Sequence, residues 1–224
     1  MIEGRNVIGI IPARAGSKRL PGKNTKALDN KPLVSWTMEA AINSKYLDQI
    51  VVTSDDLDIK NICEETNLTY LERASELATD EISSYAVVED VLSKFDGFHI
   101  AVLLQPTSPF RTEFHIDEAL EQFQAANATS LVSVCRVEHA IEWAGTIDDE
   151  GFFCPLNKAA LGIQSQGLQP NFRLNGAIYI NQISLFLREK VFVQEGCQAF
   201  VMDAKSSVDI DTEEDFKYAQ FLLK

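Results

Sequence analysis

The sequence is poor in the residues on which several common kinds of site depend. Its 224 residues contain only four cysteines, at positions 63, 135, 154 and 197, with no Cys-x-x-Cys pair and none near a histidine. That spacing excludes a typical zinc site and a compact disulfide framework, so we expect reduced thiols and a cytoplasmic location. The three histidines, at positions 99, 115 and 139, form no nucleophile–base pattern.

Long apolar runs and an excess of positive charge are also missing. No run approaches the roughly 20 apolar residues that a membrane-spanning helix needs, and no charged leader with an apolar core begins the chain. The net charge of −13 and the pI near 4.6 argue against nucleic acid and anionic membranes as partners. We therefore expect neither nucleic acid nor a membrane to be a partner.

Positive charge is concentrated near the start of the chain. Residues 1–31 contain seven of the 20 Lys and Arg side chains but only two of the 33 acidic ones, a local net charge of +5. A buried strand is predicted at 6–11, because this run is short, rich in β-branched residues and closed by Pro12. The basic loop at 14–24 follows that strand directly. Loops of this kind bind phosphate in α/β proteins, through backbone N–H groups and cationic side chains.

The loop fits neither of the two commonest phosphate-binding motifs. A P-loop has four residues between its first glycine and Gly-Lys, followed by Ser or Thr. Here five residues separate Gly16 from Gly22, and Asn24 follows Lys23. Gly16 also begins no G-x-G-x-x-G fingerprint of a dinucleotide site. A solvated basic turn is the remaining alternative, and the density of cations argues against it.

Apolar patterning predicts alternating strands and helices. Strands are expected at 6–11, 50–53, 68–71, 100–104 and 130–134, and helices at 32–44, at 57–66, after Ser83 and Ser84, and around 116–123. These units indicate a single α/β domain over 1–224, with a Rossmann-like, mixed and mostly parallel sheet and helices on both faces. Ligands bind beyond the carboxyl ends of such strands, where 14–24, 80–84 and 105–111 should converge.

Two aspartates near the end of the chain form a second candidate site. Asp209 and Asp211 are two residues apart, so in an extended segment both carboxylates point to the same side. Paired carboxylates beside a triphosphate suit Mg²⁺, which prefers hard oxygen ligands. The alternative is structural: Asp211 or Thr212 would cap the last helix, whose first turn is rich in acids. That alternative does not explain Asp209.

Five blocks, spread over nearly the whole chain, carry a family resemblance. They read RAGSKRLPGKN at 14–24, RASELATD at 73–80, LLQPTSPFR at 103–111, FRLNGAIYI at 172–180 and SVDIDT at 207–212. In this order they closely resemble the sugar-acid cytidylyltransferases, and in particular the nonulosonate branch that includes the CMP-N-acylneuraminate synthetases. Lys23-Asn24 is similar to that branch, whereas the branch acting on the eight-carbon acid Kdo typically has proline after the lysine.

The resemblance implies an enzyme and the roles of its residues. It implies CMP transfer from CTP to the anomeric hydroxyl of a nine-carbon 2-keto sugar acid of sialic, legionaminic or pseudaminic type, with Mg²⁺ held by Asp209 and Asp211. It implies catalysis by Lys23, Asp209 and Asp211, and CTP contacts from Arg14, Ser17, Lys23, Asn24, Arg73 and Ser84. It implies sugar contacts from Gln105, Thr107, Arg173, Asn175 and Tyr179, although pattern alone favours a core position for Tyr179. Arg111 is open between a pair with Glu113 and the nucleotide site.

The resemblance also implies a homodimer. After about residue 139 the pattern becomes irregular, and exposed-looking aromatic residues occur at 143, 152, 153, 172 and 192. We expect residues from about 139 to 195 to form a small dimerisation extension. Two other functions stay open: a Kdo cytidylyltransferase, and a module that binds CTP or sugar without catalysis.

Overall fold

A mixed sheet of seven strands organises the chain. The computed structural model describes residues 1–79, 81–164 and 167–224. The strands lie in the order β11-β7-β10-β6-β1-β4-β5, and neighbours are parallel except that β10 runs antiparallel to both β6 and β7. Their bounds are β1 Val7–Pro12, β4 Gln49–Ser54, β5 Thr69–Glu72, β6 Ile100–Leu103, β7 Ser130–Arg136, β10 Phe172–Gln182 and β11 Gln198–Val201. The predicted fold class is confirmed.

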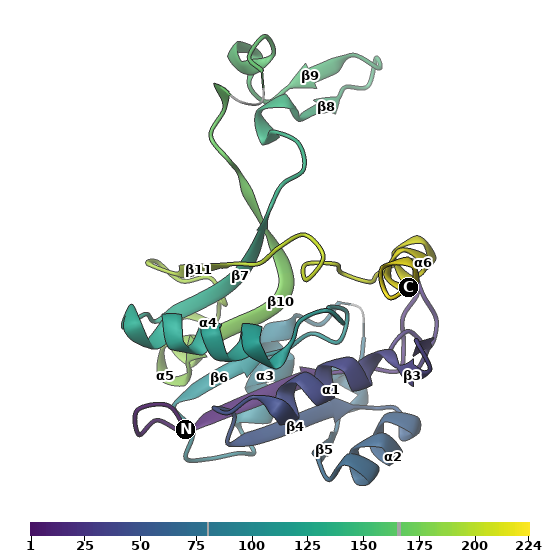
Figure 1. The fold of residues 1–224 in the computed structure, drawn as a ribbon, viewed down its shortest axis with the longest axis vertical. Coiled ribbons are helices and arrows are strands. Elements are labelled where there is room, and N and C mark those ends of the chain that lie inside the picture. Colours follow the sequence, from purple (N-terminus) through teal and green to yellow (C-terminus); the bar gives the residue numbers. More distant parts are fainter. Residues whose placement is uncertain (80, 165–166) are drawn as a thin grey trace.

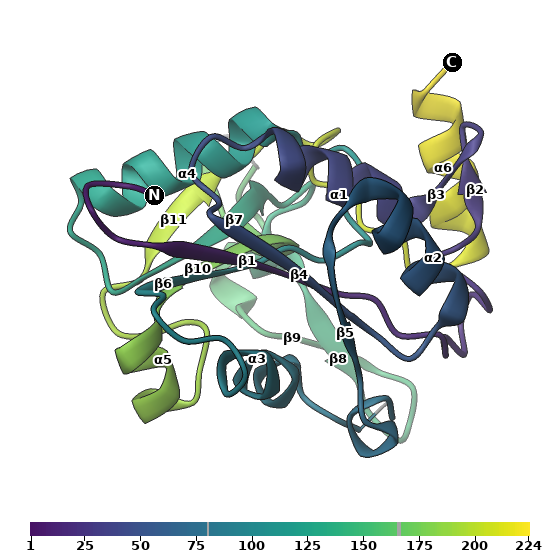
Figure 2. The same cartoon turned by 90° about the horizontal axis from the view of Figure 1, so that it is seen from below.

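Helices cover both faces of this sheet (Figure 2). One face packs against α1 (Leu33–Asn43), α2 (Leu57–Thr66) and α4 (Glu113–Ala125), and the other packs against α3 (Ser84–Leu92) and α5 (Ile183–Glu189). Side chains alternate along β1, so Val7 and Ile11 enter the first layer while Ile8 and Ile10 enter the second. The sheet is therefore buried on both sides, as its continuous apolar strands predict.

Side-chain caps fix where two helices begin. The Asp56 carboxylate accepts a hydrogen bond from the Asp58 N–H at 2.9 Å and so caps the start of α2. Ser83 accepts from the Ala86 N–H at 3.3 Å at the start of α3, so Ser84 is the first helical residue.

A third, smaller cluster lies outside the two main layers. It joins α6 (Glu213–Leu222) to β2 (Ala27–Leu28) and to the segment before the helix, through Leu20, Leu28, Leu33, Val208, Ile210, Phe216 and Ala219. The short hairpin of β2 and β3 (Lys31–Pro32) completes this corner of the fold. The cluster therefore supports both the basic loop and the two aspartates.

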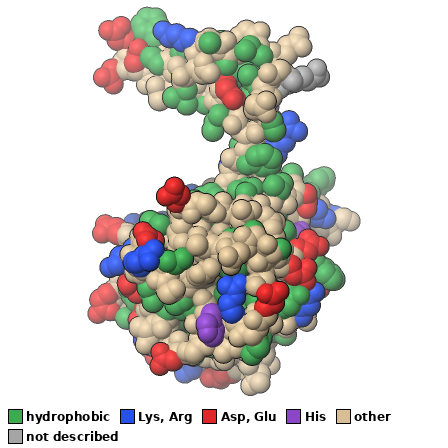
Figure 3. All heavy atoms as spheres, turned by 90° about the vertical axis from the view of Figure 1, so that its left-hand side faces the viewer, with side chains coloured by type: hydrophobic (Ala, Val, Ile, Leu, Met, Phe, Trp, Pro, Cys, Tyr) green, Lys and Arg blue, Asp and Glu red, His purple; other side chains and the backbone are tan. Residues whose placement is uncertain are grey.

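A slender extension stands away from the body on the ends of β7 and β10 (Figures 1 and 3). It contains β8 (Gly145–Ile147), β9 (Phe153–Pro155) and the short 3-10 helices Ile141–Trp143 and Lys158–Ala160; a further one, Ser75–Leu77, follows β5 in the body. The predicted extension at 139–195 is longer than the projecting part, because β10 and α5 belong to the body. Phe192 also belongs there, since its ring lies 5.2 Å from that of Tyr179.

One local signal in the sequence does not match the structure. Asn175-Gly176 has the composition of a hairpin turn, but the chain continues through it as β10, with an irregularity in the pairing to β7 between Leu174 and Tyr179. Gly176 has a φ of +77°, which glycine adopts without strain. The pair therefore makes a bulge inside a strand rather than a turn between strands.

The remaining global features are simple. All four cysteines are free, and Cys63 and Cys135 are buried. Across the described residues, no helix has the length and apolar character needed to cross a bilayer.

Candidate active site

A cleft of about 460 Å³ opens at the carboxyl ends of β1 and β6. Four distant segments meet there: the loop after β1, the segment that leads into α3, the residues after β6, and the segment 207–212 before α6, which we call the aspartate strap. Ten of the thirteen predicted site residues line it: Arg14, Ser17, Lys23, Asn24, Arg73, Ser84, Gln105, Thr107, Asp209 and Asp211. The predicted convergence of these segments is therefore seen in the structure.

Hydrogen bonds within the chain shape the basic loop. Asn24 donates from Nδ2 to the carbonyl oxygen of Arg14 at 2.9 Å and so closes the loop on itself. Near its end, the Lys23 N–H donates to the carbonyl oxygen of Leu20 at 3.1 Å, and Gly22 supports this turn with a φ of +64°. Asn24 is only 9% exposed, so most of its side chain serves the loop.

Lys23 reaches across the cleft to the aspartate strap. Its Nζ lies 2.9 Å from Oδ1 of Asp211 and donates to the carbonyl oxygen of Ile210 at 3.0 Å. Arg19 pairs with the other oxygen of the same carboxylate, with Nη2 2.8 Å from Oδ2. The loop and the strap are therefore joined by charge as well as by the apolar cluster beneath them.

Asp209 lies deeper than Asp211. Its carboxylate is largely buried, and its Oδ1 has no hydrogen-bond partner among the described residues. Burial raises the pKa of Asp209 above its usual value, and the charge of Asp211 raises it further, while Thr107 and Lys23 act in the opposite direction. Asp209 is thus a carboxylate whose charged form lacks a full set of partners.

The strap has a fixed position relative to the sheet. The Ile210 N–H donates to the carbonyl oxygen of Thr107 at 2.8 Å, which places the strap beside the residues that follow β6. Thr212 caps α6 and forms a capping box with Asp215. The capping alternative thus applies to Thr212, and the carboxylate of Asp211 stays on the cleft.

The donor set suits Mg²⁺. Asp209 and Asp211 offer hard oxygen atoms on one side of the cleft, and the orphaned Oδ1 of Asp209 is an acceptor in need of a partner. Within the described part of the chain, no cluster of three or more His, Cys, Asp or Glu side chains could hold a metal. Two carboxylates without a protein cage are typical of Mg²⁺ sites in which phosphates and water supply the remaining ligands.

The far end of the cleft is more apolar. Leu77, Ile82 and Val87 line it together with Arg73 and Ser84. Arg73 is 5% exposed, and its Nη2 donates to the carbonyl oxygen of Thr53 at 2.8 Å. Burial lowers the pKa of Arg73, and the nearby carboxylate of Asp55 partly offsets this effect. Asp80 of the same block lies outside the described residues.

The bulge of β10 lies close to two side chains that line the cleft, Gln105 and Asp209. A Cβ atom added to Gly176 would lie 2.7 Å from Oε1 of Gln105 and 4.0 Å from Oδ2 of Asp209. A side chain at position 176 would therefore displace the amide of Gln105, and the φ of +77° favours glycine independently. The bulge thereby limits the positions open to the side chain of Gln105, which lines the cleft.

Three predicted sugar-binding residues do not line this cleft. Arg173 is exposed at the base of the extension, where Nη1 donates to the carbonyl oxygen of Leu174 at 3.4 Å. Tyr179 packs against Phe192, as its pattern suggests. Asn175 is 1% exposed. The predicted sugar contacts of these three residues stay predictions.

The buried amide of Asn175 has protein partners on both sides. Its Oδ1 accepts from Ser133 Oγ at 2.5 Å, and its Nδ2 donates to Ser207 Oγ at 2.9 Å. Asn175 therefore links the bulge of β10 to β7 and to the segment that leads to Asp209. This network holds the segment that carries Asp209 against the bulge of β10.

Sequence reasoning missed several residues of the cleft. Arg19 lies in the predicted loop, yet nothing in its spacing distinguishes it from Lys18. The apolar side chains Leu77, Ile82 and Val87 have no chemical signature of their own, although their place after Arg73, in the segment up to the first turn of α3, was a usable signal.

Comparison with known proteins identifies the family. The model of the Cytidylyltransferase family matches residues 8–223. The chain is 39% identical over 211 residues to an N-acylneuraminate cytidylyltransferase of Streptococcus agalactiae serotype V, covering 93% of this chain and 51% of that protein. It is 36% identical over 231 residues to the CMP-N,N'-diacetyllegionaminic acid synthase of Legionella pneumophila, covering 97% of this chain and 96% of that protein. The chain thus spans about half the length of the first group of relatives and nearly all of the second.

Solved structures support the fold. A CMP:2-keto-3-deoxy-manno-octonic acid synthetase in complex with CTP has a TM-score of 0.75 at 16% identity, with 97% of this chain and 98% of that chain covered. A 4-diphosphocytidyl-2C-methyl-D-erythritol synthase from Anaerococcus prevotii has a TM-score of 0.70 at 17% identity, with 99% of this chain and 97% of that chain covered. At these identities the likeness concerns the fold alone.

Fold and cleft together define an α/β protein with a mixed, mostly parallel sheet and a cleft at the carboxyl ends of its strands that is lined by cations and carboxylates. Its basic loop, its aspartate strap and the match over nearly its whole length narrow this class. The chain belongs to the cytidylyltransferase family.

Proposed function

We propose that the chain transfers CMP from CTP to the anomeric hydroxyl of a nine-carbon 2-keto sugar acid. The observation that carries the proposal is the meeting of Asp209 and Asp211 with the cations of the loop after β1 in a single cleft. The sequence relatives support it, because they are named for N-acylneuraminate and N,N'-diacetyllegionaminic acid. A pseudaminic acid cytidylyltransferase of Campylobacter jejuni, 29% identical over 224 residues and covering 96% of this chain and 95% of that protein, extends the same substrate class.

The cleft has a region for each part of CTP. Arg14, Ser17 and Lys23 on the basic loop would neutralise the phosphates, and Asn24 would keep the loop in shape. The apolar region near Arg73 and Ser84 would hold the nucleoside. A strand-to-loop exit rich in N–H groups and cations suits a triphosphate.

Asp209 and Asp211 would hold Mg²⁺ beside the phosphates. When bound, the ion would neutralise charge that builds up on the phosphate oxygens. The chain's own residues position the reactants: the anomeric oxygen forms a bond to the α-phosphorus and loses its proton, and the bond from that phosphorus to the departing pyrophosphate breaks. Positioning and charge stabilisation account for most catalysis of this kind.

The sugar acid would lie on the side of Gln105 and Thr107. An amide and a hydroxyl suit a polyhydroxylated ligand, and the bulge at Gly176 limits the space beside Gln105. We assign Arg173 to the sugar carboxylate, which its planar guanidinium can bind through two hydrogen bonds. Because Arg173 lies at the base of the extension and outside the cleft, this contact requires either that the sugar extends from the cleft to Arg173 or that Arg173 reaches the cleft of a second subunit. Tyr179 and Asn175, which do not line the cleft, would support the sugar site indirectly through β10.

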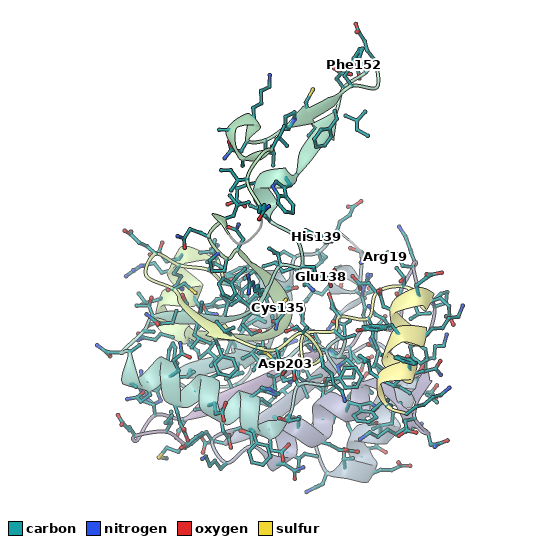
Figure 4. All side chains as sticks on the ribbon, turned by 45° about the horizontal axis from the view of Figure 1, so that its top comes forward. Arg19, Cys135, Glu138, His139, Phe152 and Asp203 are labelled. Carbon is teal, nitrogen blue, oxygen red and sulfur yellow. The ribbon has the colours of Figure 1, made fainter. Side chains whose placement is uncertain are left out.

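We further propose a homodimer formed through the extension. Large apolar side chains cover this small element and are exposed in the single chain: Ile147 is 74% exposed, Phe152 64% and Phe153 55%. Figure 4 shows Phe152 at the tip, far from the body. Exposed apolar side chains on such a thin element favour burial against another chain. We place the reaction in the cytoplasm, where CTP is made and free thiols persist, and its product in the assembly of surface glycans.

A pyrophosphate-release assay tests this function. Purified protein, CTP and Mg²⁺ are combined in turn with N-acetylneuraminic, legionaminic and pseudaminic acids and with Kdo. We expect turnover with at least one nine-carbon acid and poor use of Kdo. Preferential use of Kdo would refute the nine-carbon assignment. Nucleotide binding without pyrophosphate release for any of the acids would favour a non-catalytic module.

A further inference from the structure

The carboxylate of Asp211 is occupied by the protein's own cations. Lys23 Nζ lies 2.9 Å from one oxygen, and Arg19 Nη2 lies 2.8 Å from the other. Lys23 also donates to the carbonyl oxygen of Ile210 at 3.0 Å, which fixes it beside the aspartate. Figure 4 shows Arg19 next to α6, on the face of the body from which the extension rises. Both oxygens that would serve a metal therefore have a positive partner.

The charges of this group cancel. Asp209 and Asp211 contribute two negative charges, and Lys23 and Arg19 contribute two positive ones. A divalent cation that approaches without nucleotide meets no net negative charge and two nearby cations that repel it. A triphosphate changes this balance, because it brings several negative charges and competes with Asp211 for the same two side chains.

The two cations differ in how readily they can move. The side chain of Lys23 is 11% exposed, whereas that of Arg19 is 66% exposed. An ion pair made by an exposed arginine contributes little stability and breaks at small cost. Arg19 is therefore the partner that a phosphate group can draw away first.

We propose that Arg19, together with Lys23, keeps Asp211 from binding metal until the triphosphate of a nucleotide takes over these cations. We call this pairing of Asp211 with Arg19 and Lys23 the lock. Metal and triphosphate then bind cooperatively, and Arg19 becomes a contact for the β- and γ-phosphates. By thermodynamic linkage, the factor by which the nucleotide raises metal affinity is also the factor by which metal raises nucleotide affinity. CMP, which lacks the β- and γ-phosphates, leaves the lock closed. The inference rests on the proposed function, because it takes CTP and Mg²⁺ as the ligands.

Titration of Mn²⁺ into the protein without nucleotide tests the lock. Free Mn²⁺ is followed by electron paramagnetic resonance for wild type, Arg19→Met and Lys26→Met. We expect Arg19→Met to bind Mn²⁺ about tenfold more tightly than wild type, since removal of one cation about 5 Å from a divalent ion relieves repulsion of that size even at the dielectric constant of water. In Arg19→Met/Asp211→Asn the gain should disappear.

Lys26→Met is the matched control. It removes the cation of the neighbouring pair between Lys26 and Glu213, whose atoms lie 2.5 Å apart, and leaves both partners of Asp211 in place. Its affinity for Mn²⁺ should equal that of wild type. An unchanged affinity in Arg19→Met, an absence of Mn²⁺ binding in that variant, or an equal gain in Lys26→Met would overturn the lock.

Calorimetry in EDTA tests the transfer of Arg19 to the phosphates. Arg19→Met should bind CTP about fivefold more weakly than wild type, because an exposed charge-assisted contact is lost, while CMP affinity stays the same. An equal change for both nucleotides would contradict the transfer. Neither titration requires turnover, so failure of the lock and failure of the proposed reaction, measured by pyrophosphate release, are told apart.

Discussion

Arg111 donates a hydrogen bond from Nη1 to the carbonyl oxygen of Ala177 at 3.1 Å, from a position that is 1% exposed. The same nitrogen donates to the carbonyl oxygen of Gln105 at 3.1 Å. Across the described residues, Arg111 forms no ion pair with a carboxylate, and burial lowers its pKa to about 9. Arg111 therefore links the exit of β6 to the bulge of β10, which is neither of the two roles that the sequence left open.

Arg111→Met removes both of these hydrogen bonds. We expect KM for the sugar acid to rise about tenfold, because Gln105 and the bulge lose their common donor, while KM for CTP changes less than twofold. Arg111→Lys should recover part of the loss. Steady-state kinetics with each substrate varied in turn measures the split, and an equal rise of both KM values would argue for a general structural role.

Replacing the two aspartates should affect the stability of the protein differently, although both side chains are needed for activity. Asp209→Asn and Asp211→Asn should each lower kcat about a hundredfold or more. Burial raises the pKa of Asp209, so the folded protein binds its proton more tightly than the unfolded chain does. The stability that this carboxyl contributes therefore falls as pH rises from the usual aspartate pKa through the raised one.

At neutral pH, Asp209→Asn removes this unfavourable charge, and its melting temperature should exceed that of wild type by about 2–4 °C per kcal/mol gained. Near pH 4 the difference should shrink. Asp211→Asn breaks the pairs with Lys23 and Arg19 and should not be stabilised. Thermal melts at both pH values, without ligands, measure these effects; identical melts for the two variants would contradict the assignment of a buried, unpartnered carboxylate to Asp209.

Lys23→Ala should damage the reaction with every sugar acid to the same degree. The charge-assisted contact that it removes is worth about 1.5–3 kcal/mol, so kcat/KM should fall roughly tenfold to a hundredfold. The pyrophosphate-release assay with two different acids is the measurement. A loss confined to one acid would place Lys23 on the sugar instead of CTP.

Gly176→Ala should displace the side chain of Gln105 in the cleft. The new Cβ would lie 2.7 Å from Oε1 of Gln105, at a φ of +77° that costs an L-residue about 1 kcal/mol. Gly151→Ala is the matched control, because its φ is +88° but its new Cβ meets nothing within 4 Å. Both variants should lose similar stability in thermal melts, whereas only Gly176→Ala should raise KM for the sugar acid. An equal effect of both variants on KM would separate the bulge from the sugar site.

Light scattering should give about twice the chain mass of 25.0 kDa at micromolar concentration. Ile147→Ser/Phe152→Ser removes two exposed apolar side chains of the extension and should shift the protein towards the monomer. Leu57→Ser, which changes a side chain that is 75% exposed on α2, serves as the control and should leave the mass unchanged. A wild-type protein of about 25 kDa would rule out the dimer.

Local patterns predicted most elements of the fold. The short apolar run of β1 and the pattern of α2 are signals carried by neighbouring residues: β1 was expected at 6–11 and is Val7–Pro12, and α2 was expected at 57–66 and is Leu57–Thr66. The antiparallel course of β10 was not predicted. Whether Asn175-Gly176 forms a turn or a bulge depends on β6 and β7, which lie far away in the sequence.

In the candidate site, too, local signals were predictable and contacts between distant segments were not. Lys23 and Asp209 were predicted from the charge and spacing of their side chains and Gln105 from the family resemblance, and all three line the cleft. Arg111 could not be assigned, since its partners are backbone carbonyls that any sequence offers. Arg19 was missed for a similar reason: its contact with Asp211 spans 192 positions of the chain.

The small cluster beneath α6 has a consequence for heat inactivation. Leu20 and Ile210 both rest on it, so the basic loop and the aspartate strap depend on the same few apolar contacts. Small peripheral units open at lower free energy than the central strands of a sheet. On warming, α6 and its cluster should therefore detach first, and turnover should be lost while the far-ultraviolet signal of the sheet is still intact.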